Sequence, residues 1–518
     1  MNFRLPYSLI LLFVFISGCA TGPGTQNDVA PLTILHWNDF HARNVPFEVT
    51  VTDSVTGAKQ KYPVGGSATL LAYMNKAGRG KENVVLLNAG DDFQGTPVSS
   101  ITMGKSQIDL MNMIKPDAVV LGNHEFDYGI SELRKNLTAA RYPILASNLY
   151  DSTTGSIFAT ASIVKTAGRV KLGIIGLLPP DLDGLTVKGT LQGMRLLNMD
   201  SVVMTHAKQL REDERVDIVV IVSHMGVDED TMLAGRVNGI DLIVGGHSHT
   251  PLHQPIRKNK TIVVQAGSWG RYLGRLQLSV DLAGDSIRTY TGELIETKVG
   301  VYEPDPSVTS VVSHLESLVD KELNQTIGTL TVEWKRNFRG ESNVGNWQAD
   351  VFRSYARTDI AFMNSGGLRK DMQPGVIKKR DIWEMNPFGN TLGTFTVTGV
   401  QLKSMVEWQA AGKGELMQIS GLTYEFDSSK PFGEMIASVK VDGVEIDPVR
   451  TYSIVTNNYV AGHLDKLFGL EQSVVITDLN ILDRDVLMEF LATHPTVATG
   501  TEGRIVDIRS PKGSGGIK

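Results

Sequence analysis

Five apolar runs of the sequence are each followed by side chains that can bind a metal ion. After the run 118–121 stands Gly122-Asn123-His124-Glu125-Phe126-Asp127, which combines an amide, an imidazole and carboxylates. The other four runs are followed by Asp39 with His41, by Asp91, by His224, and by His247 with His249. Oxygen and imidazole ligands of this kind suit zinc, manganese or similar divalent ions. Their recurrence after separate runs predicts a metal site.

The spacing of these residues indicates how they could converge. Asp39 and His41 are two positions apart, as are His247 and His249, and extended backbone places such a pair on one side of the chain. Asp91 follows a glycine in an expected tight turn, which is a suitable place for a carboxylate that bridges two ions. Two ions roughly 3.5–4 Å apart can activate a water and hold a phosphoryl oxygen during in-line displacement.

Each signal has a structural alternative. A lone histidine after a strand, such as His224, is often a hydrogen-bonded structural residue, and Asp39 with His41 could be turn chemistry. Asp92 is expected to be solvated or to support the site. The histidines outside the motifs are expected to be structural: His206, His253, His314, His463 and His494. Agreement across five runs favours the metal site.

The apolar runs themselves predict an α/β fold. Strands are expected at 32–35, 84–87, 118–121, 170–177, 217–222, 240–244, 261–265 and 275–281, with helical stretches near 65–74 and 108–114. Such short runs of β-branched and aliphatic residues, separated by helices, indicate mostly parallel strands buried on both faces. The polar residues then lie beyond the carboxyl ends of the strands, where α/β sheets bind ligands.

A change of pattern near residue 299 indicates a second domain. After Asp305-Pro306, apolar residues recur at three- and four-residue spacing: Val308, Val311, Val312, Leu315, Leu318, Val319 and Leu323. This spacing predicts an amphipathic helix, and we interpret 301–325 as a link between two domains. Residues 326–509 show mixed α and β patterns, and 510–518 are expected to be a flexible tail.

The overall composition limits the possible functions. The chain has 518 residues, 42% of them hydrophobic, which is enough for two or three domains. The net charge of −6, without a basic excess, argues against nucleic acid as a partner. A single cysteine excludes an intrachain disulfide and a cysteine-based zinc site.

The first residues predict export. Arg4 precedes the short apolar core 9–16, and residues 1–18 are interpreted as a signal peptide. Ile16-Ser17-Gly18-Cys19 resembles a bacterial lipobox, in which Cys19 is lipidated and anchors the protein to the membrane. Residues 19–31 would be the tether. We therefore expect a periplasmic or cell-surface lipoprotein; the alternative is a plain cleaved signal with an incidental cysteine.

The five motifs together resemble a known family. Asn38-Asp39-Phe40-His41, Ala89-Gly90-Asp91, the string 122–127, Ser223-His224-Met225-Gly226 and Gly245-Gly246-His247-Ser248-His249 resemble the calcineurin-like metallophosphoesterases. Their spacing is most similar to the 5′-nucleotidase/UDP-sugar hydrolase family. The resemblance covers nearly the whole mature chain. It implies a metallophosphoesterase β-sandwich flanked by helices at 32–300 and a smaller C-terminal α/β nucleotide-binding domain at 326–509.

The same resemblance implies roles for the residues of the first half. One metal would be held by Asp39, His41, Asp91 and His249, and the other by Asp91, Asn123, His224 and His247, with Asp91 as the bridge. His124 would bind no metal. Oriented by Asp127, it would meet the developing charge on the phosphate or the leaving group, as an acid or an electrostatic stabiliser.

The resemblance also implies a nucleotide site in the second half. Arg339 and Arg369 would contact phosphate, Phe388 and Tyr459 would stack on the base, Asn364 would contact the base, and Asp465 would bind the ribose hydroxyls. Three departures bear on substrate choice: Ser365 replaces a family glycine, 460–465 reads Val-Ala-Gly-His-Leu-Asp where Gly-Gly-Asp is expected, and Tyr459 is often phenylalanine.

These patterns predict an exported two-metal phosphohydrolase acting on nucleoside 5′-monophosphates, with nucleoside diphosphates or UDP-sugars as further substrates. Two rivals use the same plan: a 2′,3′-cyclic-nucleotide phosphodiesterase with 3′-nucleotidase activity, and a sulfur-ester hydrolase. A lipoprotein that captures nucleotides without turnover is a third alternative, and the complete set of ligands argues against it. Metal identity, base preference and oligomeric state stay open.

Overall fold

The computed structural model describes residues 28–52, 56–470 and 474–509. The predicted signal peptide, Cys19, the first part of the tether and the tail 510–518 lie outside the described residues. Strand β1 (Val29–Trp37) begins within the predicted tether, so the folded body starts before Leu32. In the described part of the chain, no helix is long and apolar enough to cross a bilayer.

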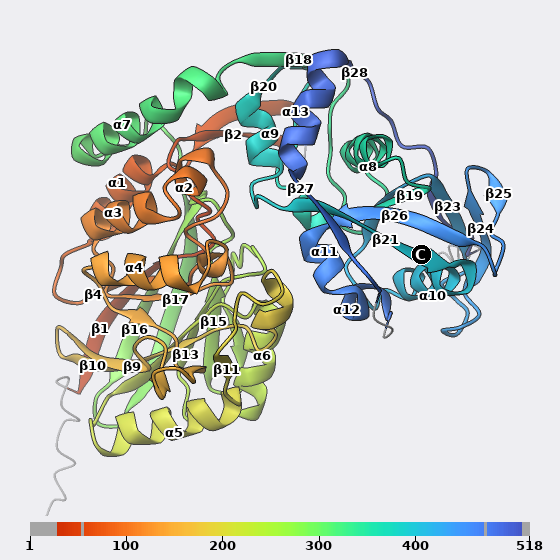
Figure 1. The fold of residues 1–518 in the computed structure, drawn as a ribbon. Coiled ribbons are helices and arrows are strands. Elements are labelled where there is room, and N and C mark those ends of the chain that lie inside the picture. Colours follow the sequence, from red (N-terminus) through yellow and green to blue (C-terminus); the bar gives the residue numbers. More distant parts are fainter. Residues whose placement is uncertain (1–27, 53–55, 471–473, 510–518) are drawn as a thin grey trace, which may run out of the picture.

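The N-terminal domain is a sandwich of two six-stranded sheets (Figure 1). The order of the first sheet is β17 (Ser286–Glu296), β16 (Tyr272–Asp281), β1, β4 (Val84–Asn88), β5 (Ala118–Val120) and β6 (Ile144–Leu145). The order of the second sheet is β14 (Ile256–Lys258), β15 (Thr261–Gln265), β13 (Leu242–Gly245), β12 (Ile218–Ser223), β10 (Val170–Leu177) and β9 (Ser162–Ala167). In each sheet four strands run parallel. The antiparallel hairpin β16–β17 completes one edge of the first sheet, and the antiparallel strands β9 and β14 form the two edges of the second.

Side-chain alternation along the strands builds the layers of this domain. In β10, Leu172 and Ile174 lie in the core between the sheets, together with Leu32 and Ile34 of β1. Ile175 and other outward residues of the second sheet pack under helices α5 (Met199–Glu212) and α6 (Val227–Arg236). The strands are therefore buried on both faces, which confirms the sequence-based prediction.

The outer face of the first sheet is also covered by helices. Residues of β1 and β4 pack there against α1 (Ser67–Ala77), α3 (Lys105–Ile114) and α7 (Pro306–Leu323). The remaining elements of this domain are α2 (Pro97–Ile101), α4 (Ile130–Ala139), the 3-10 turns η1 (His124–Phe126) and η2 (Leu182–Leu185), the hairpin β2 (Phe47–Thr52)–β3 (Lys59–Val64), and the small sheet β7 (Leu149–Asp151), β8 (Ser156–Ile157) and β11 (Met194–Leu196).

Helix α7 forms from the amphipathic segment between the two halves. The Asp305 side chain caps it by accepting the main-chain N–H groups of Ser307 and Val308, and Pro306 occupies the first turn, where its missing N–H costs nothing. The helix packs on α1, α2 and α3 of the N-terminal domain. Its far end leads directly into β18 (Thr326–Leu330) of the second domain.

The C-terminal domain is built on a five-stranded sheet. Its order is β22 (Met417–Ser420), β19 (Ile360–Asn364), β26 (Thr451–Asn457), β21 (Thr391–Thr398) and β27 (Thr477–Leu482). One face packs with α8 (Asn343–Ala356), α9 (Lys379–Met385) and α13 (Asp483–Thr493). The other face packs with α10 (Gly399–Ala410), α11 (Asn458–Gly462), α12 (Leu464–Phe468) and the sheet β25 (Val444–Glu445), β24 (Ile436–Val441), β23 (Leu422–Phe426) and β29 (Ile505–Asp507).

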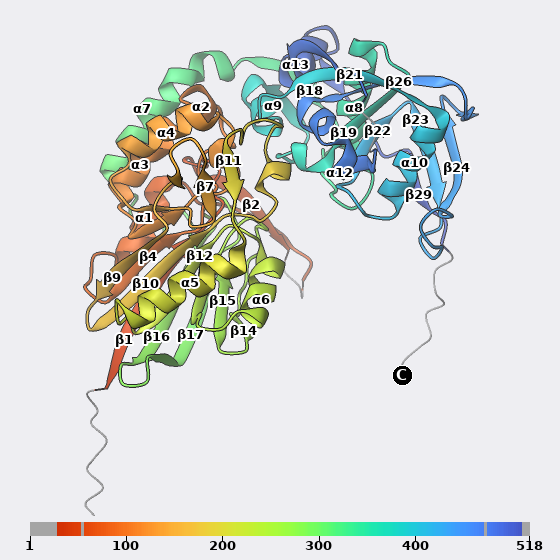
Figure 2. The same cartoon turned by 60° about the horizontal axis from the view of Figure 1, so that its bottom comes forward.

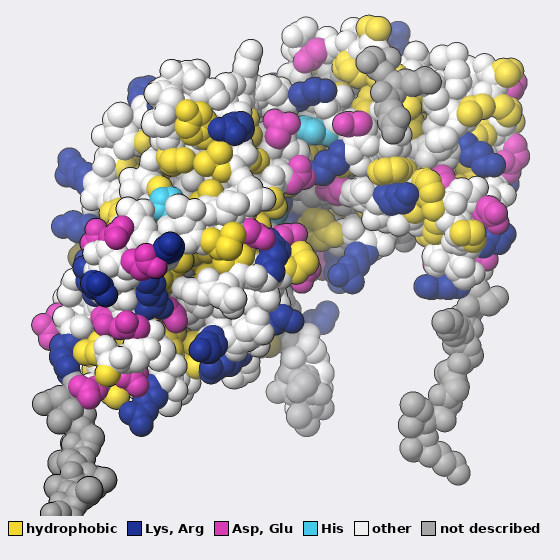
Figure 3. All heavy atoms as spheres, turned by 90° about the horizontal axis from the view of Figure 1, so that it is seen from below, with side chains coloured by type: hydrophobic (Ala, Val, Ile, Leu, Met, Phe, Trp, Pro, Cys, Tyr) yellow, Lys and Arg dark blue, Asp and Glu magenta, His cyan; other side chains and the backbone are white. Residues whose placement is uncertain are grey.

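The two domains lie side by side in both ribbon views (Figures 1 and 2). The 3-10 turn η3 (Ser365–Gly367) follows β19, and a third small sheet of β20 (Gly375–Lys378), β18 and β28 (Thr496–Val497) completes the second domain. On the face seen in Figure 3, basic and acidic side chains are interspersed over both domains.

Candidate active site

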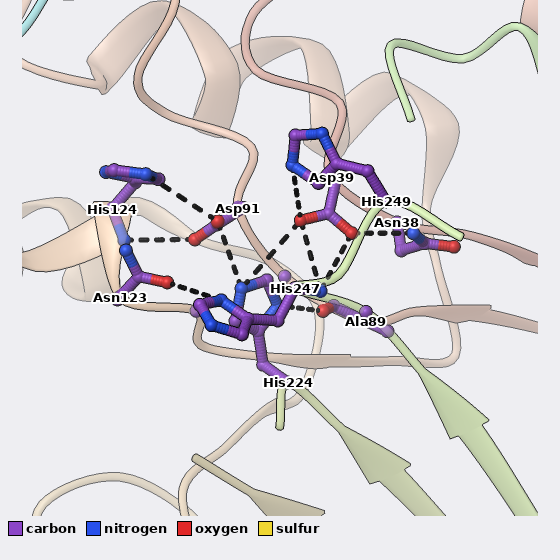
Figure 4. A network of polar contacts seen from close by, with 12 residues as sticks. Asn38, Asp39, Ala89, Asp91, Asn123, His124, His224, His247 and His249 are labelled. Atoms are coloured by element: carbon purple, nitrogen blue, oxygen red, sulfur yellow. Dashed lines mark hydrogen bonds and ion pairs between the residues drawn. The ribbon is translucent and has the colours of Figure 1, made fainter. Parts of the chain in front are cut away.

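The predicted metal ligands meet at one edge of the sandwich. Asp39, Asp91, Asn123, His224 and His247 follow strands β1, β4, β5, β12 and β13. Both sheets end there, so residues that are far apart in sequence converge (Figure 4). Three groups of side chains lie close enough together to hold an ion: Asp39 with His41 and His249, Asp91 with His41 and His124, and Asp91 with His224 and His247.

The first ligand group is compact and largely buried. The Nε2 atom of His249 lies 3.2 Å from Asp39 Oδ1 and 3.0 Å from the Nε2 atom of His41. The other ring nitrogen of His41, Nδ1, lies 2.9 Å from the carbonyl oxygen of Gln94, a contact that requires a proton on Nδ1. In neutral His41 the Nε2 lone pair is thus left facing the centre of the group.

Asp91 lies between the two ligand groups. Its Oδ2 atom is 3.0 Å from His224 Nε2, 3.9 Å from His41 Nε2 and 4.0 Å from His124 Nε2. Its Oδ1 atom accepts the main-chain N–H of His124 at 2.9 Å. One carboxylate therefore faces both sets of imidazoles, which is the geometry that a bridging ligand requires.

His224 gives a direct test of whether the site suits a metal. Its Nδ1 lies 2.6 Å from the carbonyl oxygen of Ala89, so that nitrogen carries the proton. Its Nε2 is fully buried and has no hydrogen-bond partner of good geometry among the described residues. A buried imine nitrogen beside two carboxylates fits a divalent cation, and the backbone contact at Nδ1 fixes the ring orientation.

The electrostatics of the cluster favour positive charge. Burial alone would lower the pKa of His224, but the charges of Asp91 and Asp39 outweigh it and raise that pKa to about 10. Burial and the charge of His249 hold the pKa of His41 well below its usual range. Burial likewise lowers the pKa of His247 to about 4. A divalent cation would take the place of the proton that the carboxylates favour on His224, while the low pKa values of His41 and His247 leave their lone pairs available to the cation.

Several ligands adopt left-handed backbone. The φ angles are 49° at Asp39, 49° at His41, 59° at Asp91, 73° at His247 and 53° at His249. The prediction that Asp39 and His41, or His247 and His249, converge through extended backbone is therefore wrong, although each pair does converge. Left-handed non-glycine residues cost free energy and cluster at functional sites because the surrounding fold enforces them.

Two glycines leave room for these turns. A Cβ atom on Gly122 would lie 2.1 Å from Asp91 Oδ1, and one on Gly246 would lie 2.5 Å from the carbonyl oxygen of Ala89. The glycines of the motifs thus allow the carboxylate and the ligand loop to approach the neighbouring backbone closely.

Two residues that the sequence motifs did not single out, Glu125 and Gln265, hold these loops. Glu125 is buried, and its carboxylate accepts the main-chain N–H groups of Gly122, Asp91, Asp92 and Phe93 at 2.6–3.2 Å. Its place inside the string 122–127 was the available signal. On the other side, Gln265 donates to the carbonyl oxygen of Gly246 at 2.8 Å and accepts from Ser248 and Thr250, which fixes the loop that carries His247 and His249.

Asp92 supports the site rather than facing solvent. It is 5% exposed, and Asn88 Nδ2 donates to its carboxyl at 3.1 Å. Burial and the neighbouring Glu125 raise the pKa of Asp92 well above its usual range. The expectation of a solvated Asp92 is wrong, and the supporting role is the one the structure shows.

His124 and Asp127 form the predicted pair. His124 Nδ1 lies 2.8 Å from Asp127 Oδ2, which also accepts from Gln94 Nε2 at 3.1 Å. Burial alone would lower the pKa of His124, but the charges of Asp127 and Asp91 raise it above its ordinary value. The two carboxylates therefore favour the protonated form of the imidazole next to the cluster, which suits a general acid or an electrostatic stabiliser.

A cavity of about 180 Å³ lies next to His124, between the domains. It is lined by Asn123, His124, Asp127, Leu185, Val187, His247, Asn364, Gly366, Arg369, Phe388, Asn390, Glu415 and Tyr459. The ring of Phe388 stacks on His124 with centroids 5.3 Å apart, and the Arg369 guanidinium lies 5.6 Å from the Phe388 centroid. Arg369 also reaches the metal ligands, with Nη2 3.4 Å from His41 Nε2.

Four of the six residues predicted to bind nucleotide line this cavity: Asn364, Arg369, Phe388 and Tyr459. Arg339 does not, because its side chain is exposed on the loop before α8. Asp465 is also exposed and lines a different cavity, with Lys188 and Asn458. Glu415, which no sequence motif singled out, is partly buried and accepts from the Asn364 side chain; desolvation raises its pKa.

A larger interdomain cavity of about 930 Å³ opens on the other side of Arg369 and His249. Apart from Arg369, its basic residues are paired with acids: Arg43 and Lys370 with Glu384, Arg336 with Asp371, Arg380 with Glu316, and Arg271 with Glu296. Away from Arg369, the basic charges of this cavity are therefore already compensated.

Comparisons with known proteins agree with this arrangement. Residues 32–251 match the calcineurin-like phosphoesterase family, and residues 326–471 match the C-terminal domain of 5′-nucleotidases. An apyrase of Tabanus yao is 30% identical and covers 92% of this chain and 93% of its own. A 5′-nucleotidase-related protein of Glossina morsitans morsitans is 30% identical, covering 96% of this chain and 98% of its own.

A solved structure shows the same architecture. The crystal structure of the 5′-nucleotidase precursor from Thermus thermophilus superposes with a TM-score of 0.83 and 29% identity, covering 93% of this chain and 100% of that one. The similarity therefore includes both domains.

Proposed function

The chain belongs to the 5′-nucleotidase family of calcineurin-like metallophosphoesterases and is a metal-dependent phosphoester hydrolase; on that premise we propose that it releases phosphate from nucleoside 5′-monophosphates with two divalent ions, zinc, manganese or similar. Nucleoside diphosphates and UDP-sugars are proposed as further substrates. The observation that carries this proposal is the position of Asp91. It faces both ligand groups, next to a cavity that is lined by two aromatic rings and an arginine.

In the proposed site, one ion is held by Asp39, His41, Asp91 and His249, and the other by Asp91, Asn123, His224 and His247. Bound ions of this kind lower the pKa of water and neutralise phosphoryl oxygens. The protein's own contribution is to hold the ligands in place before substrate arrives, with five of them, Asp39, His41, Asp91, His247 and His249, in left-handed turns that the surrounding fold enforces.

The neighbouring side chains would orient and protonate the substrate. Arg369 lies between the metal ligands and Phe388, so its planar guanidinium can bind phosphate oxygens while the base lies against the aromatic rings. His124, whose pKa the charge of Asp127 raises, is placed to donate a proton to the 5′ oxygen as it leaves.

A substrate panel tests the reaction. AMP, UDP-glucose, 2′,3′-cyclic AMP and 3′-AMP are incubated with the purified protein and added manganese or zinc, and phosphate release is measured. We expect turnover of AMP that is lost with EDTA and restored by metal. Release from only the cyclic or 3′ substrates would overturn the 5′ assignment.

Metal content tests the two-ion arrangement. The reconstituted protein should bind two equivalents, and Asp91→Ala should lose most of the metal, because that variant removes the ligand shared by both groups. Less than one equivalent bound together with intact nucleotide binding would favour capture without turnover.

We also propose that the protein is exported and anchored through Cys19. The signal-like residues 1–18 and the lipobox-like string ending at Cys19 support this proposal. In a bacterial host, the wild type should fractionate with membranes, and Cys19→Ser should be released in soluble form. A wild type that is soluble after export would favour a plain cleaved signal.

A further inference from the structure

The small cavity beside His124 has walls from both domains. The C-terminal domain supplies Phe388, Tyr459, Asn364 and Glu415, and the N-terminal domain supplies apolar side chains, Leu185 and Val187. These two residues belong to the segment 181–188, which follows the end of β10 and includes η2; we refer to it as the strap.

The strap is anchored in its own domain. Leu182, Gly184 and Thr186 are buried, and Leu182 packs in the cluster that contains Phe126 and Leu178. The residues between them therefore point outward. Val187 is 38% exposed although it is apolar, and it lies on the wall of the cavity, where a ligand would cover it.

A short stretch of the C-terminal domain holds the main chain of the strap. The Tyr459 hydroxyl donates to the carbonyl oxygen of Gly184 at 3.1 Å. His463 Nε2 lies 3.2 Å from the carbonyl oxygen of Asp183, and its Nδ1 lies 2.8 Å from the carbonyl oxygen of Tyr459. Lys466 forms an ion pair with Asp181. Three side chains of α11 and α12 and the turn between them thus position the strap.

We propose that the strap is the part of the base site contributed by the N-terminal domain, that Leu185 and Val187 help to select the base, and that Tyr459, His463 and Lys466 are its positioning residues. The inference rests on the proposed function, because the occupant is the planar base of a nucleotide. The cavity matches that occupant: aromatic rings can stack on the base, Asn364 and Glu415 can meet its polar edge, and the strap supplies an apolar edge.

Tyr459 has two separable parts in this arrangement. Its ring lines the cavity, and its hydroxyl holds the strap. A phenylalanine at this position would keep the ring and lose the link to Gly184. Tyr459→Phe therefore isolates the strap contact from stacking, and Lys466→Met removes a second strap contact from a residue that does not line the cavity.

The first test compares substrates with and without a base. For each variant, kcat/KM is measured for AMP and UMP and divided by kcat/KM for p-nitrophenyl phosphate. We expect this ratio to fall about 3–10-fold in Tyr459→Phe and in Lys466→Met, the size of one lost hydrogen bond. Leu185→Ala should change the AMP/UMP preference by more than about 3-fold, the size of a contact from a few methyl groups.

Matched control variants remove the same groups elsewhere on the C-terminal domain. Tyr355→Phe removes a hydroxyl from an exposed side chain of α8, and Lys403→Met removes an exposed charge from α10. Both should keep the wild-type ratio.

The second test does not depend on turnover. Lys188 is an exposed trypsin site at the end of the strap. Cleavage after Lys188, followed by mass spectrometry, should be faster in Tyr459→Phe and Lys466→Met than in the wild type, and adenosine or uridine should slow it in the wild type.

Failure of the strap proposal and failure of the proposed function would give different results. If the wild type hydrolyses AMP but both strap variants keep the wild-type ratio and cleavage rate, the strap proposal is overturned and the proposed function stands. If the wild type hydrolyses no nucleoside 5′-monophosphate, the proposed function fails, and unchanged cleavage with adenosine and uridine would overturn the strap proposal as well.

Discussion

Glu125 and Asp91 are joined through the main chain: Glu125 Oε2 accepts the main-chain N–H of Asp91 at 3.0 Å, while Asp91 Oδ1 accepts the main-chain N–H of His124 at 2.9 Å. The string 122–127 and the loop after β4 therefore fix each other. This mutual support explains how Asp91 can keep a left-handed φ of 59° at the centre of the site.

Replacing Glu125 should weaken metal binding without removing any ligand. In Glu125→Gln, the side-chain amide would put an N–H group next to main-chain N–H donors, so the loop carrying Asp91 would relax. We expect metal affinity to fall about 10–100-fold, the usual effect of losing a group that orients a ligand. Calorimetric titration with manganese measures this change. Wild-type affinity in a folded Glu125→Gln protein would contradict the positioning role.

His124→Ala should separate acid catalysis from metal binding. Both ions should stay bound, because His124 is not among the proposed ligands. Turnover of AMP should slow by about 10²–10⁴, the usual contribution of a general acid. Turnover of p-nitrophenyl phosphate should slow much less, because p-nitrophenolate leaves without a proton. Equal losses on both substrates would point instead to electrostatic stabilisation of the phosphoryl group.

Asp127→Asn should move the pH profile of the enzyme. Burial opposes protonation of His124, and the negative charges of Asp127 and Asp91 raise its pKa. Without the Asp127 charge that pKa falls, so His124 loses its proton at lower pH. The alkaline limb of kcat for AMP should therefore shift toward lower pH. An unchanged limb would show that another group controls it.

The metal ligands could be predicted from sequence because each follows a strand of characteristic composition. The runs 170–177 and 261–265 have the bounds of β10 and β15, since β-branched and aliphatic residues buried on both faces leave little ambiguity. The left-handed turns at His41 and His249 could not be predicted, because they depend on contacts between strands from two sheets.

The roles of residues that act through long-range contacts also could not be predicted from sequence patterns. Glu125 lay inside a recognised string, but its role depends on main-chain N–H groups about thirty residues earlier in the chain. The strap is another example, since Leu185 and Tyr459 meet only after the two domains pack. A local motif names residue types, and tertiary packing decides which of them face the cavity.

The family resemblance implies that both Arg339 and Arg369 contact phosphate, and the structure places these two arginines differently. Arg369 lies between the metal ligands and Phe388, whereas Arg339 is exposed and outside the cavity. Arg369→Met should lower kcat/KM for AMP about 10–100-fold, because charge-assisted hydrogen bonds to phosphate are lost. Arg339→Met should change it by less than about 3-fold. A large loss in Arg339→Met would show that the loop before α8 moves into the site when substrate binds.

Asp230 should make the stability of the N-terminal domain depend on pH. This carboxyl is fully buried in the first turn of α6; Ser223 donates to Oδ1 at 2.6 Å, and Oδ2 has no hydrogen-bond partner among the described residues. Burial raises the pKa of Asp230 from 3.8 to about 7. An unfolded chain therefore gives up this proton at lower pH than the folded one, and ionisation favours unfolding.

Because the unfolded chain loses the Asp230 proton first, raising the pH through this range destabilises the folded protein. Below pH 4 the carboxyl is protonated in both states, and its contribution to the free energy of unfolding is fully present. Between pH 4 and pH 7 this contribution is lost, by up to about 4 kcal/mol. Above pH 7 the carboxyl is ionised in both states, and the free energy of unfolding no longer changes through this group. Asp230→Asn cannot titrate. The free energy of unfolding of the variant, minus that of the wild type, should therefore rise between pH 4 and pH 7 and then level off.

Urea unfolding with a chelator present measures this difference at each pH. Asp228→Asn is the matched control, because Asp228 lies in the same helical turn and is exposed. Its difference from the wild type should show no comparable rise. A constant difference for Asp230→Asn across the whole range would mean that the buried carboxyl finds a partner that stabilises its charge, and Oδ2 would then have to be hydrogen-bonded in solution.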